Sequence, residues 1–382
     1  MDNARVLFWE IAFWLCVGLL VYAQIGYPLL LAALARMRRA RPAAPPADEL
    51  PTVSLIIAAY NEGAVIAAKV ANALALDYPQ ERLEVVVASD GSTDGTVLEA
   101  RRAGAHHVLG LERGGKIRAQ DAAVARSRAD VVAFSDANST WAPDALRTLV
   151  GAFADSRVGY ACGQVTFVSG SDGGTNQEGL YWRYEMALRR LESCLLSVTA
   201  GNGAIYATRR EAYIEVDPIM GHDLSFPFNM VKRGRRAVYM PQACATEKMV
   251  PSIGGEFARK RRMMSHAWPI VLRGGLLSPR GYPPLYMLMI ASHRVLRYAA
   301  PFLHIGALVA SFVLGASSAF YAVALALQLA LVVAAMLGRI VPLRPLLVIR
   351  YYVLTVASIA AGLWDWLRHG TPAGWEPAEG TR

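Results

Sequence analysis

The sequence predicts an α/β domain with a mainly parallel sheet, helices on both faces of that sheet, and transmembrane helices at both ends of the chain. Two observations lead to this fold class. Residues 7–35 and 285–364 are dominated by apolar side chains, whereas residues 51–275 have the composition of an ordinary soluble protein. Within this central part, short apolar runs alternate with helical stretches, which is the pattern of a parallel sheet covered by helices.

The first apolar segment, residues 7–35, is long enough to cross a bilayer, for which about 20 residues suffice. A cleavable signal peptide would begin with basic residues. Here the basic residues follow the apolar run, at Arg36, Arg38, Arg39 and Arg41. The positive-inside rule therefore predicts an external N-terminus and a cytosolic central domain, in a bacterial inner or plasma membrane. We assign residues 1–40 to this helix and its flank, and the Pro/Ala-rich residues 41–52 to a linker.

The C-terminal apolar region, residues 301–364, is expected to contain transmembrane helices. Residues 301–316 and 319–337 predict a membrane hairpin, because the arginines before and after it can all lie at the cytosolic surface. Residues 346–364 form a third apolar stretch that contains Arg350. This stretch either crosses the membrane or turns back, and the sequence leaves both arrangements open.

Residues 53–275 remain as the soluble domain, followed by residues 276–300, which are expected to include an amphipathic helix lying in the membrane interface. Residues 365–382 form a tail. The formal charge of +9 is explained by arginines that flank the membrane segments, so nucleic acid is not an expected partner. The four cysteines are far apart, which indicates neither a zinc site nor a disulfide framework.

Continuous apolar runs predict strands at residues 53–59, 83–89, 106–110 and 130–136. Helices are expected at about 63–76 and 117–128, and the charged side chains of a later helix at 178–199 are expected to be solvated. In a parallel sheet, ligands bind beyond the carboxyl ends of the strands. Polar residues stand at three of these ends, namely Tyr60-Asn61-Glu62, Asp90 and Asp136-Ala137-Asn138, with Lys116 on the intervening connection. We therefore expect them to meet at one edge of the sheet.

Asp136 and Asn138 place a carboxylate and an amide oxygen on one tight turn. Oxygen ligands of this kind suit Mg²⁺ or Mn²⁺, which usually keep further positions for phosphates and water. A metal held there would neutralise a diphosphate leaving group. The alternative for Asn138 is a cap for the helix that is expected to contain Pro143 in its first turn.

Several segments, in the right order, make this chain resemble the membrane-bound family 2 glycosyltransferases. These nucleotide-sugar-dependent enzymes have a GT-A fold and include relatives of cellulose and hyaluronan synthases. The segments are AAYNE (58–62), SDGSTDGT (89–96), GGK (114–116), DAN (136–138), GNGAIYATRR (201–210), GHDLSFPFNMVKRG (221–234) and EFARKRRMMSHAW (256–268). The last of these replaces the Q-x-x-R-W motif of processive members, which is absent in strict form.

The resemblance implies a role for each group of residues. Asp223 would be the catalytic base. The donor nucleotide and its phosphates would be bound by Tyr60, Glu62, Asp90, Lys116, Asp136, Arg259 and Arg262, and the metal by Asp136 and Asn138. The acceptor would be contacted by Gly201, Asn202, Gly203, His222 and Trp268. Simpler alternatives are a solvated helix start for His222, attraction of the basic run 259–262 to anionic lipids, and an interfacial anchor for Trp268.

The function implied by the resemblance is an inverting glycosyltransferase. It would move a sugar from a nucleotide-diphosphate donor, a UDP-sugar, to a saccharide or lipid-linked acceptor at the membrane during cell-surface polysaccharide synthesis. Membrane lipids and a homo-oligomer or export partner would assist. Two alternatives stay open: transfer of a single sugar to polyprenyl phosphate, and a non-catalytic membrane scaffold that retains the fold.

Overall fold

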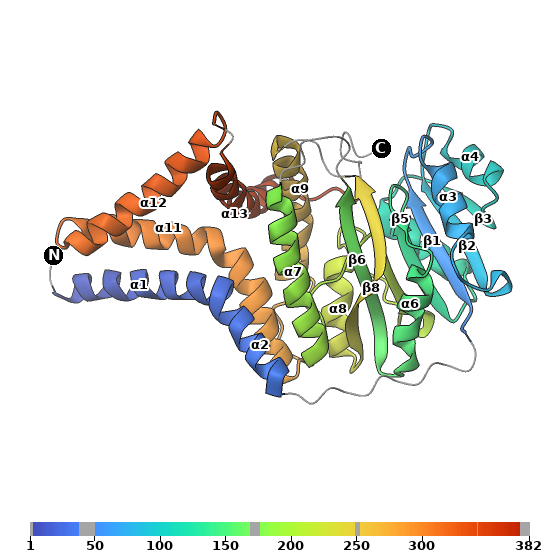
Figure 1. Ribbon diagram of the computed structural model, residues 1–382, viewed down its shortest axis with the longest axis horizontal. Helices are drawn as coiled ribbons and strands as arrows, with labels where there is room; N and C mark the ends of the chain where they lie inside the picture. The colour runs from blue at the N-terminus through green and yellow to red at the C-terminus, as the bar shows by residue number, and fades with distance from the viewer. Residues whose placement is uncertain (1–2, 38–49, 169–175, 249–252, 342, 375–382) are drawn as a thin grey trace.

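The computed structural model describes residues 3–37, 50–168, 176–248, 253–341 and 343–374. Figure 1 shows an α/β domain beside a group of long helices that extend away from it. The domain contains an eight-stranded sheet with the strand order β3-β2-β1-β4-β7-β6-β8-β5. Most of the expected linker, residues 41–49, and the end of the expected tail, residues 375–382, lie outside the described residues.

The first half of the sheet is parallel, as the sequence predicts. Its strands are β1 (Val53–Ala59), β2 (Leu83–Asp90), β3 (His107–Leu111) and β4 (Val131–Asp136). β1 lies between β2 and β4 and is buried at every residue. A strand covered on both faces needs apolar side chains throughout, which is why the run reads as continuously apolar.

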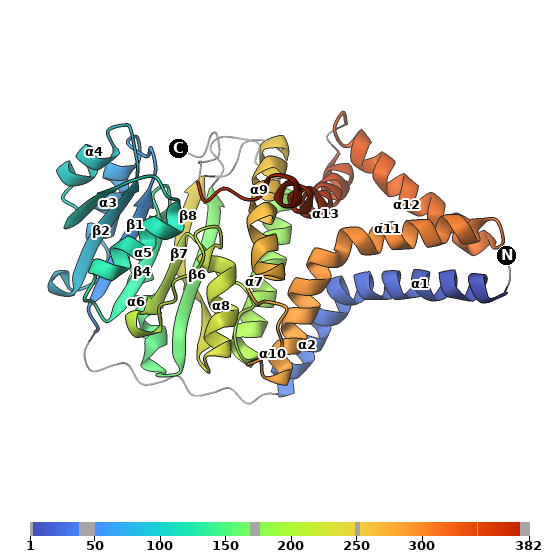
Figure 2. The same ribbon diagram turned by 180° about the vertical axis from the view of Figure 1, so that it is seen from behind.

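Helices cover both faces of this sheet (Figure 2). Apolar residues of α3 (Ile66–Leu74), α4 (Thr96–Arg102) and α6 (Ala145–Gly151) pack into one core cluster. Those of α5 (Lys116–Arg126) and α8 (His222–Lys232) pack into the cluster on the other face. Short 3-10 turns lie at Gln80–Arg82, Ala152–Ala154 and Arg210–Ala212.

The second half of the sheet is mixed, which the alternation of strands and helices does not predict. β7 (Ile205–Arg209) runs antiparallel to both β4 and β6 (Val158–Val168), and β8 (Arg236–Lys248) is parallel to β6. β5, the two residues Thr140–Trp141, pairs antiparallel with the end of β8.

The short strand β5 corrects two expectations about the turn after β4. α6 begins at Ala145, with Asp144 at its N-cap position and no side-chain cap, so Pro143 precedes the helix. β5 follows Asn138 almost directly. Asn138 is therefore not a helix cap, and that alternative is wrong.

Four helical spans are long and apolar enough to cross a membrane. The first combines α1 (Asn3–Val21), a π-helical segment (Tyr22–Gly26) and α2 (Tyr27–Met37). The second combines α10 (Pro284–Met289), a π-helical segment (Ile290–Val295) and α11 (Leu296–Gly315). The others are α12 (Ala319–Leu337) and α13 (Arg344–His369). Residues 284–300 are therefore part of a continuous helix and do not form a separate one.

The last span, α13, does not run alongside the others. α1 and α11 lie side by side, whereas α13 is seen nearly end-on in both Figures 1 and 2. α13 packs against α9 (Ile253–Leu272), where Lys260 Nζ donates to Tyr351 and Thr355, and Arg261 pairs with Asp365. Both arrangements expected for residues 346–364, crossing the membrane or turning back, stay predictions.

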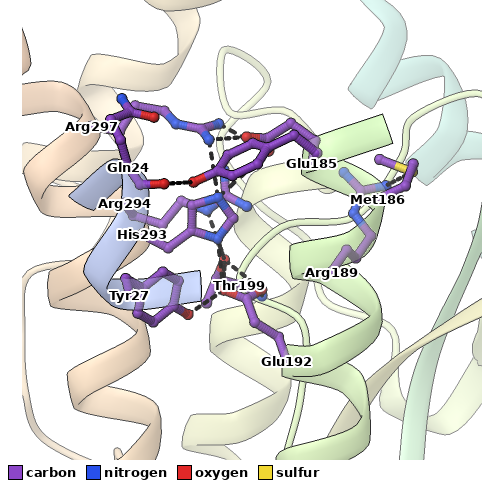
Figure 3. Close-up of polar contacts among 11 residues, drawn as sticks. Gln24, Tyr27, Glu185, Met186, Arg189, Glu192, Thr199, His293, Arg294 and Arg297 are labelled. Atoms are coloured by element: carbon purple, nitrogen blue, oxygen red, sulfur yellow. Dashed lines mark hydrogen bonds and ion pairs between the residues drawn. The ribbon is translucent and has the colours of Figure 1, made fainter. Parts of the chain in front are cut away.

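A buried set of charged side chains joins the membrane helices to α7 (Asn176–Leu195). Figure 3 shows this junction network, which consists of Tyr27, Glu185, Glu192, Thr199, His293, Arg294 and Arg297. Glu192 is fully buried. Its carboxylate accepts from Tyr27 Oη at 2.7 Å and from the backbone N–H of Thr199 at 3.0 Å, and it lies 2.6 Å from His293 Nδ1.

The other members of the junction network are also paired. Arg297 forms an ion pair with Glu185, and Arg294 Nε donates to Thr199 Oγ1 at 2.8 Å. Burial would raise the pKa of Glu185, but Arg297 and His293 beside it hold that pKa well below its ordinary value. The expectation that the charged side chains of this helix are solvated is therefore wrong for Glu185, Arg189 and Glu192, all of which are buried.

Candidate active site

The carboxyl ends of β1, β2 and β4 meet at one edge of the sheet, as expected. The register pairs Ala59 with Ser89 and Ala58 with Asp136, so the residues that follow these positions lie next to one another. The backbone N–H of Asn61 donates to Ser92 Oγ at 3.0 Å. Glu62 is buried, and its backbone N–H donates to Thr96 Oγ1 at 2.8 Å. The first two strand ends are thus tied together.

Asp90 holds the glycine loop that precedes Lys116. Its buried carboxylate accepts from the backbone N–H of Gly114 at 2.6 Å and from that of Gly115 at 3.0 Å. Gly115 has a φ of 97°, a conformation that L-residues with a side chain rarely adopt. The aspartate and the glycines together fix where α5 starts, and therefore where the side chain of Lys116 begins.

Two contacts of the glycine loop could not be anticipated from sequence. The Arg113 guanidinium lies over the ring of Tyr60, 3.2 Å from its centroid. The segment after α13 also reaches the loop, because the backbone of Ala373 occupies the place where a side chain of residue 115 would lie. Thr371 Oγ1 fixes this segment by donating to the Ser265 carbonyl at 2.8 Å.

Lys116 connects the glycine loop to the turn after β4. Its ammonium group forms an ion pair with Asp136 Oδ1, and both side chains are one-fifth exposed. A cation and a carboxylate at the mouth of parallel strands are the groups needed to handle the charge of a diphosphate.

Asp223 lies across from this ion pair, in the first turn of α8. A methyl carbon placed on Gly203 would lie 3.9 Å from Lys116 Nζ and 4.0 Å from Asp223 Cβ. The backbone N–H of Gly201 donates to the Asp223 carbonyl at 2.6 Å, and Tyr160 leaves no space for a side chain at Gly201. Asn202 lies between these glycines and is half-buried. The structure therefore brings Lys116, Asp136, Gly203 and Asp223 together.

His222 does not share the surroundings of its neighbour Asp223. Only 2% of it is exposed, and it packs among aromatic rings, with the centroid of Phe226 4.1 Å away. Its Nδ1 lies 2.7 Å from Tyr206 Oη. Burial, together with the nearby Lys116, lowers the pKa of His222 to about 3. A solvated helix start is therefore wrong, and the buried ring offers no exposed nitrogen to an acceptor.

Trp268 is also buried, which corrects both interpretations of it. Only 6% of it is exposed, its Nε1 donates to the Ile359 carbonyl of α13 at 2.9 Å, and Tyr298 packs against its ring. It is neither an interfacial anchor nor an open platform for a sugar, because the α9–α13 contact covers it.

The basic residues 259–262 of α9 point in two different directions. Lys260 and Arg261 contact α13, as described above, whereas Arg259 forms an ion pair with Glu256 at 2.7 Å. Arg259 also lies near enough to Glu247 to lower its pKa. Arg262 is exposed and lies near His266, whose pKa is lowered by burial. Arg259 is thus directed toward the strand ends and Lys260 toward α13, as the helical spacing of the run predicts.

A cavity of about 210 Å³ lies beside the turn after β4. We call it the turn pocket; its polar lining consists of Lys69, Asn138, Ser139, Thr140, Thr246, Glu247 and Lys248. Sequence reasoning missed Lys69 and Glu247. Glu247 stands near the end of β8 as Asp136 stands at the end of β4, but β8 mixes polar and apolar residues and was not recognised as a strand.

The charged residues of the turn pocket are poorly satisfied. Lys69 Nζ and Glu247 Oε1 are buried and have no hydrogen-bond partner in the described part of the chain. Burial lowers the pKa of Lys69 to about 7, against the opposing effects of Asp136 and Glu247. Burial and Asp136 raise the pKa of Glu247 to about 7. Both shifts place these groups close to the Asp136 carboxylate.

The donor set at this turn fits a hard divalent cation by type. Asp136 and Asn138 present carboxylate and amide oxygens, and a buried carboxylate oxygen of Glu247 lacks a partner in the same pocket. Among the described residues, no three His, Cys, Asp or Glu side chains are gathered closely enough to hold an ion by themselves. An ion here would thus use Asn138, phosphate or water oxygens in addition.

Comparison with known proteins supports the same family. Residues 54–216 match the family described as Glycosyl transferase family 2. An N-acetylglucosaminyltransferase of Rhizobium sp. is 28% identical over 62% of this chain and 56% of its own length. A beta-monoglucosyldiacylglycerol synthase of Synechocystis sp. is 34% identical over 38% of this chain and 33% of its own length. A poly-beta-1,6-N-acetyl-D-glucosamine synthase of Staphylococcus aureus is 24% identical over 63% and 61%, respectively.

These matches span from one third to about three fifths of the length of those relatives. A solved structure, the mannosyltransferase PcManGT from Pyrobaculum calidifontis with GDP-Man and Mn²⁺, is similar with a TM-score of 0.69. It is 24% identical, and the likeness covers 94% of this chain and 99% of that chain. This likeness concerns the fold, and it confirms the expected GT-A domain with apolar helices at both ends. Residues 54–216 of this chain therefore match glycosyltransferase family 2, and the fold of the whole chain is similar to that of a solved glycosyltransferase.

Proposed function

We propose that this protein is an inverting membrane glycosyltransferase that moves a sugar from a UDP-sugar to a saccharide or lipid-linked acceptor, in the synthesis of a cell-surface polysaccharide. The observation that carries the proposal is the position of Gly203, which brings Asp223 close to the Lys116–Asp136 ion pair. A base on one side of a small gap and charge-stabilising groups on the other suit direct displacement at an anomeric carbon.

In this proposal Asp223 accepts the proton of the attacking hydroxyl group. Lys116, and Arg259 from α9, stabilise the negative charge of the departing diphosphate. Gly201 and Gly203 leave room for the acceptor, and Asn202 lies beside it. Tyr60, Glu62 and Asp90 form the nucleoside end of the site, where Asp90 acts by holding the glycine loop.

Asp136 and Asn138 would hold Mg²⁺ or Mn²⁺ in this site. A bound ion would supply charge neutralisation for the diphosphate. Lys116 pairs with Asp136 in the structure, and its ammonium group would contact a phosphate of the donor. The PcManGT structure was solved with Mn²⁺, which agrees in kind with this assignment.

Two classes of acceptor are compatible with the relatives. The Staphylococcus aureus relative is named for a polymer of N-acetylglucosamine, whereas the Synechocystis relative is named for a glycolipid. Thin-layer analysis of products made by isolated membranes from a panel of radiolabelled nucleotide sugars distinguishes them. A ladder or polymer supports polysaccharide synthesis, and one mobile glycolipid supports transfer of a single sugar to a lipid such as polyprenyl phosphate.

The role of Asp223 is tested by Asp223→Asn. We expect turnover to fall by about 10²–10⁴-fold, because the base is lost, while UDP binding is kept. Asp217→Asn, at a nearby exposed aspartate that contacts its own turn, is the matched control and should leave turnover unchanged. Unchanged turnover in Asp223→Asn would exclude Asp223 as the base.

The membrane setting completes the proposal. By the positive-inside rule, the arginines near the end of the first apolar segment and before the C-terminal hairpin support a cytosolic catalytic domain. Labelling of introduced cysteines in intact cells by a membrane-impermeant reagent tests this orientation. Labelling near Asn3 with no labelling in the catalytic domain is expected, and the reverse pattern would contradict it.

A further inference from the structure

The turn pocket holds two features that the proposed function leaves unused. β5 pairs with β8 so that Thr140 lies opposite Thr246 and Trp141 opposite Ala245. In this antiparallel register, Glu247 continues past Thr246 as the chain runs back from Thr140 toward Asn138. The strand pairing thus places Glu247 beside the turn that carries Asp136 and Asn138, although more than a hundred residues separate them in sequence.

The carboxyl group of Glu247 is set up for a ligand. Glu247 Oε1 is buried and has no hydrogen-bond partner among the described residues, and Glu247 lines the same cavity as Asn138. A buried acceptor without a partner destabilises the folded state. A divalent cation bound at the turn would give this oxygen a partner.

Lys69 provides a second, independent observation. It is 3% exposed, its Nζ has no hydrogen-bond partner among the described residues, and it lines the same pocket from α3. No ion pair joins Lys69 to Glu247, although the two interact electrostatically with each other and with Asp136. The pocket therefore brings a buried cation near two carboxylates without pairing it to either one.

From this geometry we infer that Glu247 is a third oxygen ligand of the divalent cation held by Asp136 and Asn138, and that the Lys69 ammonium opposes the binding of that cation. This inference rests on the proposed function, which places the cation at the turn. Two carboxylates and an amide oxygen form an all-oxygen set of the kind Mg²⁺ and Mn²⁺ take, with positions left for phosphates. Glu247 would also offset the weaker ligand that Asn138 supplies in place of a second aspartate.

The two residues predict effects of opposite sign on cation affinity. Glu247→Gln replaces a charged carboxylate ligand with a neutral amide oxygen, which binds a divalent cation more weakly, so affinity should fall by about tenfold. Replacing the lysine by Lys69→Met removes a positive charge next to the ion while keeping a side chain of similar length, so affinity should rise. General damage to the pocket would lower affinity in both variants.

The test measures Mn²⁺ binding by electron paramagnetic resonance on the detergent-solubilised full chain, with and without UDP. The variants are Glu247→Gln, Lys69→Met, Asp136→Asn and, as a control, Glu215→Gln at an exposed position of the same domain. Thermal unfolding of each variant verifies that it is folded. Weaker binding in Glu247→Gln, tighter binding in Lys69→Met and unchanged binding in Glu215→Gln are the expected results.

The outcomes separate this inference from the function on which it rests. Wild-type affinity in Glu247→Gln, with binding lost in Asp136→Asn, would overturn the role of Glu247 and leave the cation at the turn. Unchanged Mn²⁺ binding in both Glu247→Gln and Asp136→Asn would overturn the assignment of a divalent cation to this turn. Weaker binding in both Glu247→Gln and Lys69→Met would show a loss of pocket shape and also overturn the ligand role.

Discussion

Two buried polar regions of this protein differ in one respect. In the junction network, each charged side chain is paired: Glu192 meets Tyr27, Thr199 and His293, and Glu185 meets Arg297 (Figure 3). In the turn pocket, Lys69 Nζ and Glu247 Oε1 are also buried, but they have no hydrogen-bond partner in the described part of the chain. Both regions contain charged groups that are buried away from water. Only the junction network pairs these groups with other side chains.

This difference distinguishes charge that holds the protein together from charge that awaits a ligand. A paired buried network contributes little net stability but costs several kcal/mol to break. An unpartnered buried charge is already costly in the folded state, and a ligand can remove that cost. We therefore infer that the junction network holds the membrane helices against α7 and that the turn pocket binds a ligand.

The largest effect is expected from breaking the junction network. Glu192→Ala would remove the carboxylate that lies 2.6 Å from His293 Nδ1 and leave the buried ring with the more distant Glu185, so we expect a loss of about 3–5 kcal/mol in unfolding free energy. Glu192→Gln should cost less, because an amide oxygen can still accept from Tyr27 and Thr199. Thermal or denaturant unfolding in detergent measures both. The exposed pair Arg235–Glu211 provides the control, since Glu211→Gln should change stability by about 0–1 kcal/mol. Equal losses of unfolding free energy in Glu192→Ala and Glu211→Gln would contradict the structural role of the junction network.

A smaller effect of opposite sign is expected in the turn pocket. Lys69→Met removes a buried ammonium group that lies 5.2 Å from the centroid of the Trp141 ring but has no hydrogen-bond partner among the described residues, so we expect a gain of about 1–3 kcal/mol in unfolding free energy when divalent ions are chelated. The pKa of Lys69 in the folded protein, about 7, lies below the ordinary lysine value of 10.5, so the folded protein carries the full penalty of the buried charge below about pH 7 and loses it as the pH rises toward 10.5. The gain should therefore shrink across that range. A loss of stability would show that Lys69 is satisfied and would contradict the comparison.

The smallest effect concerns His222, which is buried in the aromatic cluster beside the site. Its pKa of about 3 in the folded protein lies below the ordinary 6.5, so the unfolded chain binds a proton more readily between these values. Stability from this residue is fully present above pH 6.5 and is lost as the pH falls toward 3. His222→Asn, whose amide can still bond to Tyr206 but does not titrate, should flatten the dependence of the unfolding midpoint on pH in this acid range. An unaltered profile would argue against a neutral, buried His222.

The parallel half of the sheet could be predicted well, and the rest of the site could not. The apolar runs of β1, β2 and β4 each end in a polar residue, so the meeting of Glu62, Asp90 and Asp136 followed from topology alone. β8 mixes polar and apolar residues along its length, which hid both its strand character and the position of Glu247. Trp268 and His222 were misjudged because burial depends on helices that pack from elsewhere in the chain.

The sequence by itself determined the α/β domain, the apolar helices and the identity of the strand ends, because each of these is written in the local order of apolar and polar residues. Only the tertiary structure decided which charges are paired. Glu192 meets His293, and Glu247 comes beside Asn138, through contacts between residues about a hundred positions apart. No local pattern encodes such a contact, because it depends on how the sheet order and the helix packing bring distant segments together.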